Sequence, residues 1–172
     1  YALGIDNVRV EIEGPEIPAM DGSAAPFFEW ADSAGRVFSE ADRRVFSLEE
    51  SIEIRDGDRS IRADPAKGLR ISYAIDFDHA LIGRQALEIP RLDKASFRSE
   101  LAAARTFGFE REVEALQKSG LGLGGSLDNT VVLGTSGILN SDGLRYSDEF
   151  VRHKVIDLVG DLALLGIRLE AH

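Results

Sequence analysis

The sequence predicts an α+β fold. Its first half contains short segments in which apolar and polar residues alternate, the pattern of half-buried strands. Its second half contains the longest segment with helical periodicity, from Ser147 to Gly166. Strands therefore precede helices along the chain instead of alternating with them, and this order is typical of α+β proteins.

The first part of the chain predicts one strand, one helix and a connection. Val8 to Ile12 alternates strictly and predicts a strand, which a Gly-Pro pair ends. Pro26 is suited to the first turn of a helix, so a short helix is expected over Phe27 to Ser33. Residues 34–44 are charged and lack apolar periodicity, which favours a linker.

Several strands are predicted in the middle of the chain. Leu48 to Arg55 alternates and runs into Asp56-Gly57, a hairpin signal, and Ser60 to Ala63 can return as its partner. Leu69 to Phe77 and Gln85 to Ile89 predict two further strands, and a proline stops the second of them.

Helical signals dominate the remainder. Asp93 is an expected N-cap for a helix that runs to about Ala104, and Phe109 to Ser119 predicts a short amphipathic helix. A glycine-rich stretch, a strand and a turn follow, at residues 121–126, Thr130–Leu133 and 140–143 respectively.

The composition excludes several classes of protein and of site. With 30 acidic and 20 basic residues the net charge is −10, which disfavours binding to nucleic-acid phosphates. No apolar run approaches the ~20 residues that span a bilayer. Cysteine is absent, so a transition metal would need carboxylates and histidines, of which there are three: His79, His153 and His172.

The long helix places possible metal ligands together. His153 and Asp157 are four residues apart and share a face, and Asp161 lies a turn further along. Imidazole and carboxylate at this spacing suit Zn²⁺, which takes three protein ligands and a water in catalytic sites. The alternative is an ordinary hydrogen bond along a helix, and a third ligand would have to come from elsewhere.

Other segments offer weaker chemical signals. Thr106, between two predicted helices, could donate to a developing oxyanion or simply cap a helix. Residues 122–126 resemble a phosphate-binding loop but lack its Gly-Lys-Ser/Thr ending, so tight strand crossings are the simpler interpretation. Residues 76–79 place an aromatic face and polar atoms at a strand end, where a base or sugar could bind, although a loop histidine is usually only solvated.

Together these segments resemble the zinc-dependent UDP-3-O-acyl-N-acetylglucosamine deacetylases of lipid A synthesis. The strongest matches are Met20 to Phe27 and Asp148 to Asp161. The other matches lie at residues 3–7, 15–18, 75–77, 104–109, 123–126 and 142–145. The resemblance covers essentially the whole chain.

The resemblance implies a layered sheet-and-helix sandwich of two α+β domains with the active site between them. Residues 1–39 would be the end of the first domain, 40–46 a linker, and 47–172 most of the second domain. A βαβ insertion at about 106–132 would shape a tunnel for the acyl chain of the substrate.

The resemblance also implies roles for individual residues. His153 and Asp157 match two of three zinc ligands, and Lys154 matches a substrate contact near the reacting centre. Thr106 matches the oxyanion-stabilising hydroxyl, and Asp161 a carboxylate that supports a catalytic histidine. The further substrate-binding positions are Phe77, Asp78, Phe107, Val113, Gly122 and Val132, of which Val113, Gly122 and Val132 would line the tunnel.

The implied reaction is hydrolysis of the N-acetyl group of UDP-3-O-acyl-N-acetylglucosamine, which releases acetate. The family's third zinc ligand and general-base glutamate lie in a Thr-Val-Glu-His segment that would fall upstream of Tyr1, and its catalytic histidine would follow His172. His79 and His172 match none of these roles. We therefore expect a fragment, cut at both ends and inactive alone, from a monomeric cytoplasmic enzyme of a Gram-negative-type bacterium.

Two other functions stay open on the sequence. A relative without catalysis could still bind a sugar nucleotide or an acyl chain, although such a protein has no need of His153, Asp157, Thr106 and Lys154 together. The second possibility is an ordinary structural α+β domain, in which the His153–Asp157 pair is only a hydrogen bond.

Overall fold

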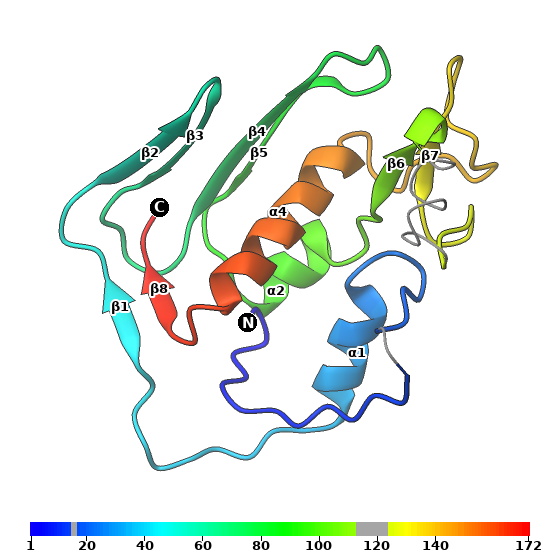
Figure 1. Cartoon of the computed structure of the whole chain (residues 1–172). Helices are drawn as coiled ribbons and strands as arrows, with labels where there is room; N and C mark the ends of the chain where they lie inside the picture. Colours follow the sequence, from blue (N-terminus) through cyan, green and yellow to red (C-terminus); the bar gives the residue numbers. More distant parts are fainter. Residues whose placement is uncertain (15–16, 113–123) are drawn as a thin grey trace.

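The computed structural model describes residues 1–14, 17–112 and 124–172 (Figure 1). Its elements, in chain order, are α1 (Ala25–Ser33), β1 (Val45–Ser47), β2 (Ile52–Asp56), β3 (Arg59–Ala63), β4 (Ile71–Phe77), β5 (Gly83–Ile89), α2 (Lys94–Ser96), the π-helical turn η1 (Phe97–Leu101), β6 (Phe107–Phe109), β7 (Val131–Leu133), α4 (Glu149–Ala163) and β8 (Arg168–Glu170). The described strands pair as β1–β8, β2–β3, β4–β5 and β6–β7. The predicted α+β class is confirmed.

The antiparallel pairs are hairpins at the predicted places. β2 and β3 pair from Ile52↔Ala63 to Asp56↔Arg59, and Gly57 in the connecting turn has a φ of 58°. A positive φ favours glycine, which explains the hairpin signal in the sequence. β4 and β5 pair along their whole length, and Ile71 and Ile75 of β4 turn their side chains into the interior.

The parallel pairs join segments that are far apart in the chain. β1 pairs with β8 and β6 pairs with β7, over three residues in each strand. β7 forms at the strand predicted over Thr130–Leu133, but three residues are too few to show a clear alternation. β1 accordingly overlaps the end of the predicted linker at 40–46, and β6 was not predicted from its pattern.

The predicted strand at Val8 to Ile12 is wrong. These residues have no regular secondary structure, and Val8 and Val10 are 70% and 69% exposed. No strand of the described segments lies beside them, and a strand needs a partner to satisfy its backbone.

The helices begin and end close to the predicted residues. α1 starts at Ala25 with proline in its first turn, and Asp93 caps α2 through a capping box with Ser96. α4 ends at Ala163, three residues before the predicted end. Of the amphipathic helix predicted over 109–119, Phe109 is the last residue of β6, residues 110–112 are helical, and the rest lies outside the described residues. No helix in the described part of the chain is both long and apolar enough to cross a bilayer.

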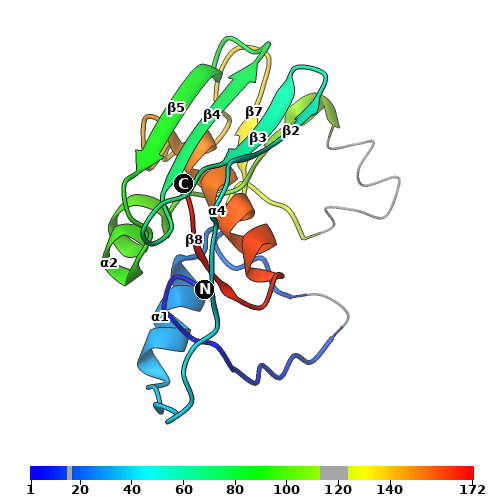
Figure 2. The ribbon, with the colours of Figure 1, turned by 90° about the vertical axis from the view of Figure 1, so that its left-hand side faces the viewer.

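The interior is built around α4. In both ribbon views the hairpins β2–β3 and β4–β5 lie next to each other, and α4 lies to one side of them (Figures 1 and 2). Val155 and Val159 of α4 pack in one buried cluster with Leu3 and Phe28, while Phe150 and Val151 pack in a second cluster. The N-terminal segment therefore shares a core with the rest of the chain.

Asp64, in the connection between β3 and β4, is held by a local polar cluster. Its carboxylate accepts hydrogen bonds from Arg62 Nε at 2.9 Å and from Ser51 Oγ at 2.5 Å. These bonds, with that from Arg62 the larger effect, lower the pKa of Asp64 from 3.8 to about 2. The stabilising effect of the charge is complete above pH 3.8 and is lost as the pH falls through about 2.

We expect Arg62→Ala to raise the pKa of Asp64 from about 2 most of the way to 3.8, because the main donor is removed. Ser51→Ala should raise it by a smaller amount. The carboxyl ¹³C chemical shift of Asp64, followed by NMR as the pH is lowered, measures the pKa of Asp64 in both variants. An unchanged pKa in Arg62→Ala would show that the guanidinium does not hold this carboxylate in solution.

Candidate functional site

The candidate site lies on α4 and on the segment 104–109, which packs against it. α4 buries Val151, Val155 and Val159 on one side. Its other side presents His153 and Asp157, with Lys154 between them in the chain. Helical spacing therefore separates the core residues of α4 from its polar residues.

His153 and Asp157 lie together and are oriented. His153 Nδ1 lies 3.0 Å from the carbonyl oxygen of Ala104, and because a carbonyl can only accept, Nδ1 is the donor. His153 Nε2 then faces Asp157 Oδ1 at 3.5 Å. A histidine held through one ring nitrogen by a backbone carbonyl is the arrangement that metal-binding histidines use.

These two side chains fit part of a metal site, which the described residues do not complete. Imidazole nitrogen and carboxylate oxygen are both ligands for Zn²⁺. The described residues contain no group of three or more His, Cys, Asp or Glu side chains that could hold a metal ion. His153 and Asp157 are thus a pair of possible ligands, and further ligands would have to come from outside the described residues.

Lys154 contacts both Asp157 and the ring of Phe107. Its Nζ lies 2.9 Å from Asp157 Oδ2 and 5.6 Å from the centroid of the Phe107 ring. The ammonium group therefore lies between a carboxylate and an aromatic face, both of which attract a cation.

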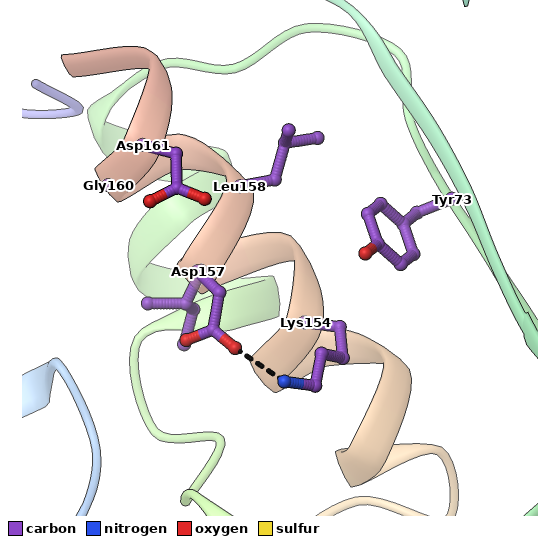
Figure 3. Close-up of a pocket in the computed structure, with 7 residues that line it drawn as sticks. Tyr73, Lys154, Asp157, Leu158, Gly160 and Asp161 are labelled. Carbon is purple, nitrogen blue, oxygen red and sulfur yellow. Dashed lines mark hydrogen bonds and ion pairs between the residues drawn. The ribbon is translucent and has the colours of Figure 1, made fainter. Parts of the chain in front are cut away.

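A hollow runs along this side of α4. Its lining residues are Tyr73, Lys154, Ile156, Asp157, Leu158, Gly160 and Asp161, and its volume is about 700 Å³. Figure 3 shows Asp157 and Asp161 on successive turns of α4, with the Tyr73 ring of β4 across from them. The structure therefore brings Asp161 to the same hollow as Lys154 and Asp157.

Thr106 is fixed by its main chain. Its N–H donates to the carbonyl of Gly22 at 2.8 Å, and its carbonyl accepts from Val131 N–H at 2.8 Å. Neither bond uses the hydroxyl. Thr106 follows Ala104 by two residues, so the hydroxyl belongs to the same short segment that orients His153.

The loop at Met20 to Ser23, which accepts the Thr106 N–H, approaches Asn129 closely because it contains a glycine. Gly22 has a φ of 78°, and a Cβ there would lie 1.8 Å from the carbonyl oxygen of Asn129. Asp21 accepts hydrogen bonds from Arg145 and Ser23. Burial opposes the charge of Asp21, but these bonds lower the pKa of its carboxyl overall.

We expect Gly22→Ala to cost about 2–4 kcal/mol of stability, from the left-handed backbone together with the clash against Asn129. Gly35→Ala is a matched control, since Gly35 has a φ of 79° and no heavy atom within 4 Å of its added Cβ. The control should cost only about 1 kcal/mol. Denaturant unfolding of both variants measures the difference, and equal costs would show that the close approach to Asn129 is absent in solution.

Aromatic residues fill the space beside β6. The Phe107 ring lies 5.8 Å from Phe77 and 5.0 Å from Phe150, and Phe109 lies 6.2 Å from Phe77 (centroid distances). Phe77 and Phe107, which were predicted as substrate contacts, therefore touch each other. Their rings form one apolar wall next to Lys154.

The remaining predicted contacts are less closely grouped. Asp78 is exposed just beyond the end of β4. Val132 lies in β7, opposite Gly108, and donates its N–H to Asn140 Oδ1 at 2.8 Å. Val113 and Gly122 lie outside the described residues.

Two buried residues of this region were missed by the sequence analysis. Arg105 and Glu149 are 2% and 0% exposed, and Arg105 Nε lies 2.9 Å from Glu149 Oε1. The hydrogen bond with Glu149 is the main reason why the pKa of Arg105 is raised. A charged residue between the alanines at 102–104 and Phe107 was the signal that could have found this pair, because a buried charge needs a partner.

Comparison with known proteins finds one family along the whole chain. The family model described as UDP-3-O-acyl N-acetylglycosamine deacetylase matches residues 1–172. Relatives named UDP-3-O-acyl-N-acetylglucosamine deacetylase include one from Anaeromyxobacter sp. (strain Fw109-5), 51% identical over 165 residues, which are 96% of this chain and 54% of the relative.

Other relatives of that name are equally similar. The protein of Nitratidesulfovibrio vulgaris (strain Hildenborough) is 52% identical, over 99% of this chain and 54% of the relative. That of Acidithiobacillus ferrooxidans (strain ATCC 53993) is 48% identical, over 99% of this chain and 56% of the relative. The chain thus spans about half the length of the curated relatives it matches.

Proposed function

Because the chain belongs to the UDP-3-O-acyl N-acetylglycosamine deacetylase family, we propose that it is part of a longer enzyme that hydrolyses the N-acetyl group of UDP-3-O-acyl-N-acetylglucosamine. The products would be acetate and the free-amine sugar nucleotide, in the committed step of lipid A biosynthesis. One structural observation supports this proposal most directly. His153, held at Nδ1 by the Ala104 carbonyl, turns Nε2 toward Asp157, as two metal ligands would lie.

The metal we propose is zinc, held in this chain by His153 Nε2 and Asp157 Oδ1. A zinc ion in such a site supplies a Lewis acid for the amide carbonyl and lowers the pKa of a water. The third ligand, the general-base glutamate and the histidine that protonates the leaving amine would lie outside this chain.

The other polar residues act on the substrate or on its proton donor. Lys154 binds the substrate near the reacting carbonyl, as its place between Asp157 and Phe107 supports. The Thr106 hydroxyl donates to the oxyanion as charge develops there. Asp161, at the edge of the same hollow, holds the catalytic histidine in place.

We propose that neighbouring segments of this chain bind the acyl chain and the nucleotide of the substrate. Phe77 and Asp78 would contact the nucleotide, and Phe107 would be a further substrate contact. The tunnel for that chain would be lined by Val113, Gly122 and Val132, in an insertion over about 106–132. Residues 1–39 would complete a first domain, joined by residues 40–46 to the second, 47–172.

The proposal extends to partners and location. A net charge of −10 disfavours nucleic acid, so the partner we propose is the nucleotide-sugar substrate alone, bound by a monomer. The reaction would take place in the cytoplasm.

The test compares the full-length protein that contains this chain with residues 1–172 alone. We expect the full-length protein to bind zinc and to release acetate from the acylated sugar nucleotide. Residues 1–172 alone should bind zinc weakly and release none. A full-length protein that binds the substrate without hydrolysing it would be a non-catalytic binding protein, and the proposed reaction would be rejected.

We expect Thr106→Val in the full-length protein to lower kcat by about 100-fold, because one donor to the oxyanion is lost. Thr106→Ser keeps the hydroxyl and should recover most of the rate. KM should change much less than kcat, since the bond strengthens only in the transition state. Steady-state kinetics of acetate release give kcat and KM for the wild-type protein and for both variants. Equal rates for Thr106→Val and Thr106→Ser would show that the Thr106 hydroxyl does not stabilise the oxyanion.

A further inference from the structure

We propose that the buried ion pair Arg105–Glu149 positions the zinc-binding histidine, by fixing the segment 104–106 against the first turns of α4. Within the described residues, no hydrogen bond joins Arg105 or Glu149 to His153 or Asp157, so both are positioning residues. The inference rests on the proposed zinc site, and it adds two residues that hold the zinc ligand His153 in place.

Arg105 is held in place by several hydrogen bonds. Glu149 Oε1 accepts from both the main-chain N–H and Nε of Arg105, each at 2.9 Å. The far end of the guanidinium donates to Asp142 Oδ2 at 2.9 Å and to the Gly143 carbonyl at 2.6 Å. Backbone and side chain of Arg105 are therefore both held, which leaves the segment little freedom to shift.

The same segment contacts α4 a second time. The carbonyl of Ala104, the residue before Arg105, accepts from His153 Nδ1 at 3.0 Å. Glu149 and His153 are four residues apart on α4, so they lie one above the other on the same face. Two successive turns of α4 thus hold two successive residues of the segment, the first through an ion pair and the second through the histidine.

Holding this segment in place also fixes the orientation and the tautomer of the His153 imidazole. The Ala104 carbonyl fixes which ring nitrogen carries the proton and where Nε2 points. If Arg105 were released, that carbonyl would be free to move away and His153 would lose its fixed tautomer. Loss of such an outer partner typically lowers metal affinity by about 10–100-fold.

A purely stabilising role is a weaker explanation of the pair. Burying two charges is expensive, and an apolar pair of similar volume is often at least as stable. Glu149 also accepts the N–H of Arg145 at 2.6 Å, so the carboxylate orders two chain segments at once. Fixing position is what such a network provides and a pair of apolar side chains does not.

The test uses Glu149→Gln and Arg105→Lys in the full-length protein. Arg152→Met is the matched control, because Arg152 forms ion pairs from the same helix with Asp148 and Glu100, away from the segment 104–106. Zinc affinity is measured by chelator competition, and the His153 tautomer by ¹⁵N NMR of the metal-free protein.

We expect zinc affinity to fall about 10–100-fold in both variants, with mixed His153 tautomers, while Arg152→Met keeps the wild-type affinity and tautomer. Unchanged affinity and tautomer in folded Glu149→Gln or Arg105→Lys would overturn the inference. If Glu149→Gln does not fold, Arg105→Lys, which keeps the charge and the main-chain bond, decides. A wild-type protein that binds no zinc would instead refute the proposed function.

Discussion

His153→Ala in the full-length protein is expected to weaken zinc binding by more than about 100-fold and to abolish measurable acetate release. Outer partners of a metal-binding histidine alone change affinity by about 10–100-fold, so loss of the ligand itself should exceed that range. Asp157→Asn should have an effect in the same direction, because it replaces a charged ligand by a neutral one.

The control for this prediction is His172→Gln. His172 contacts Ser72 Oγ through Nε2 at 2.8 Å, on the part of the chain next to β8, and it has no role in the proposed site. Metal analysis after dialysis, together with the rate of acetate release, distinguishes the variants. Full zinc occupancy in His153→Ala would show that the histidine is an ordinary partner of Asp157.

Arg105→Met is expected to destabilise the fold by about 3–5 kcal/mol, because it leaves the fully buried carboxylate of Glu149 without its cation. This cost is a large part of the stability of a typical domain. Denaturant unfolding, with the midpoint compared at an unchanged slope, measures it.

The double variant Arg105→Met/Glu149→Gln tests the cause. It removes both charges and keeps an amide oxygen that can accept a main-chain N–H, so it should lose less stability than Arg105→Met alone. If the double variant were the less stable of the two, the cost would come from lost packing and not from an unpaired charge.

Elements with a long repeating pattern could be predicted from the sequence. The hairpins β2–β3 and β4–β5 and the helix α4 all form where alternation or helical spacing indicated them. The segment Val8 to Ile12 has the same alternation and forms no strand. Alternation shows that a segment suits a sheet, but it does not show whether a partner strand is beside it.

The candidate site was predictable where it depends on spacing within one helix. His153 and Asp157 meet because they are four residues apart. Ala104 supplies a main-chain carbonyl, which has no side-chain signature in a sequence. Arg105 and Glu149 are separated by 44 positions, and only the folded chain brings them together. The roles of all these residues in catalysis stay predictions.

The sharing of α4 between core and site has a consequence for how this segment can vary among related proteins. Each residue of an α-helix is turned by about 100° from the one before it, so one inserted or deleted residue rotates everything that follows. A deletion after Glu149 would turn Asp157 toward the positions of buried valines and bring a valine to the hollow. Substitutions can accumulate in such a helix one position at a time, but its length between Glu149 and Asp161 has to stay constant. Differences in length among related chains should therefore fall in the connections on either side of α4.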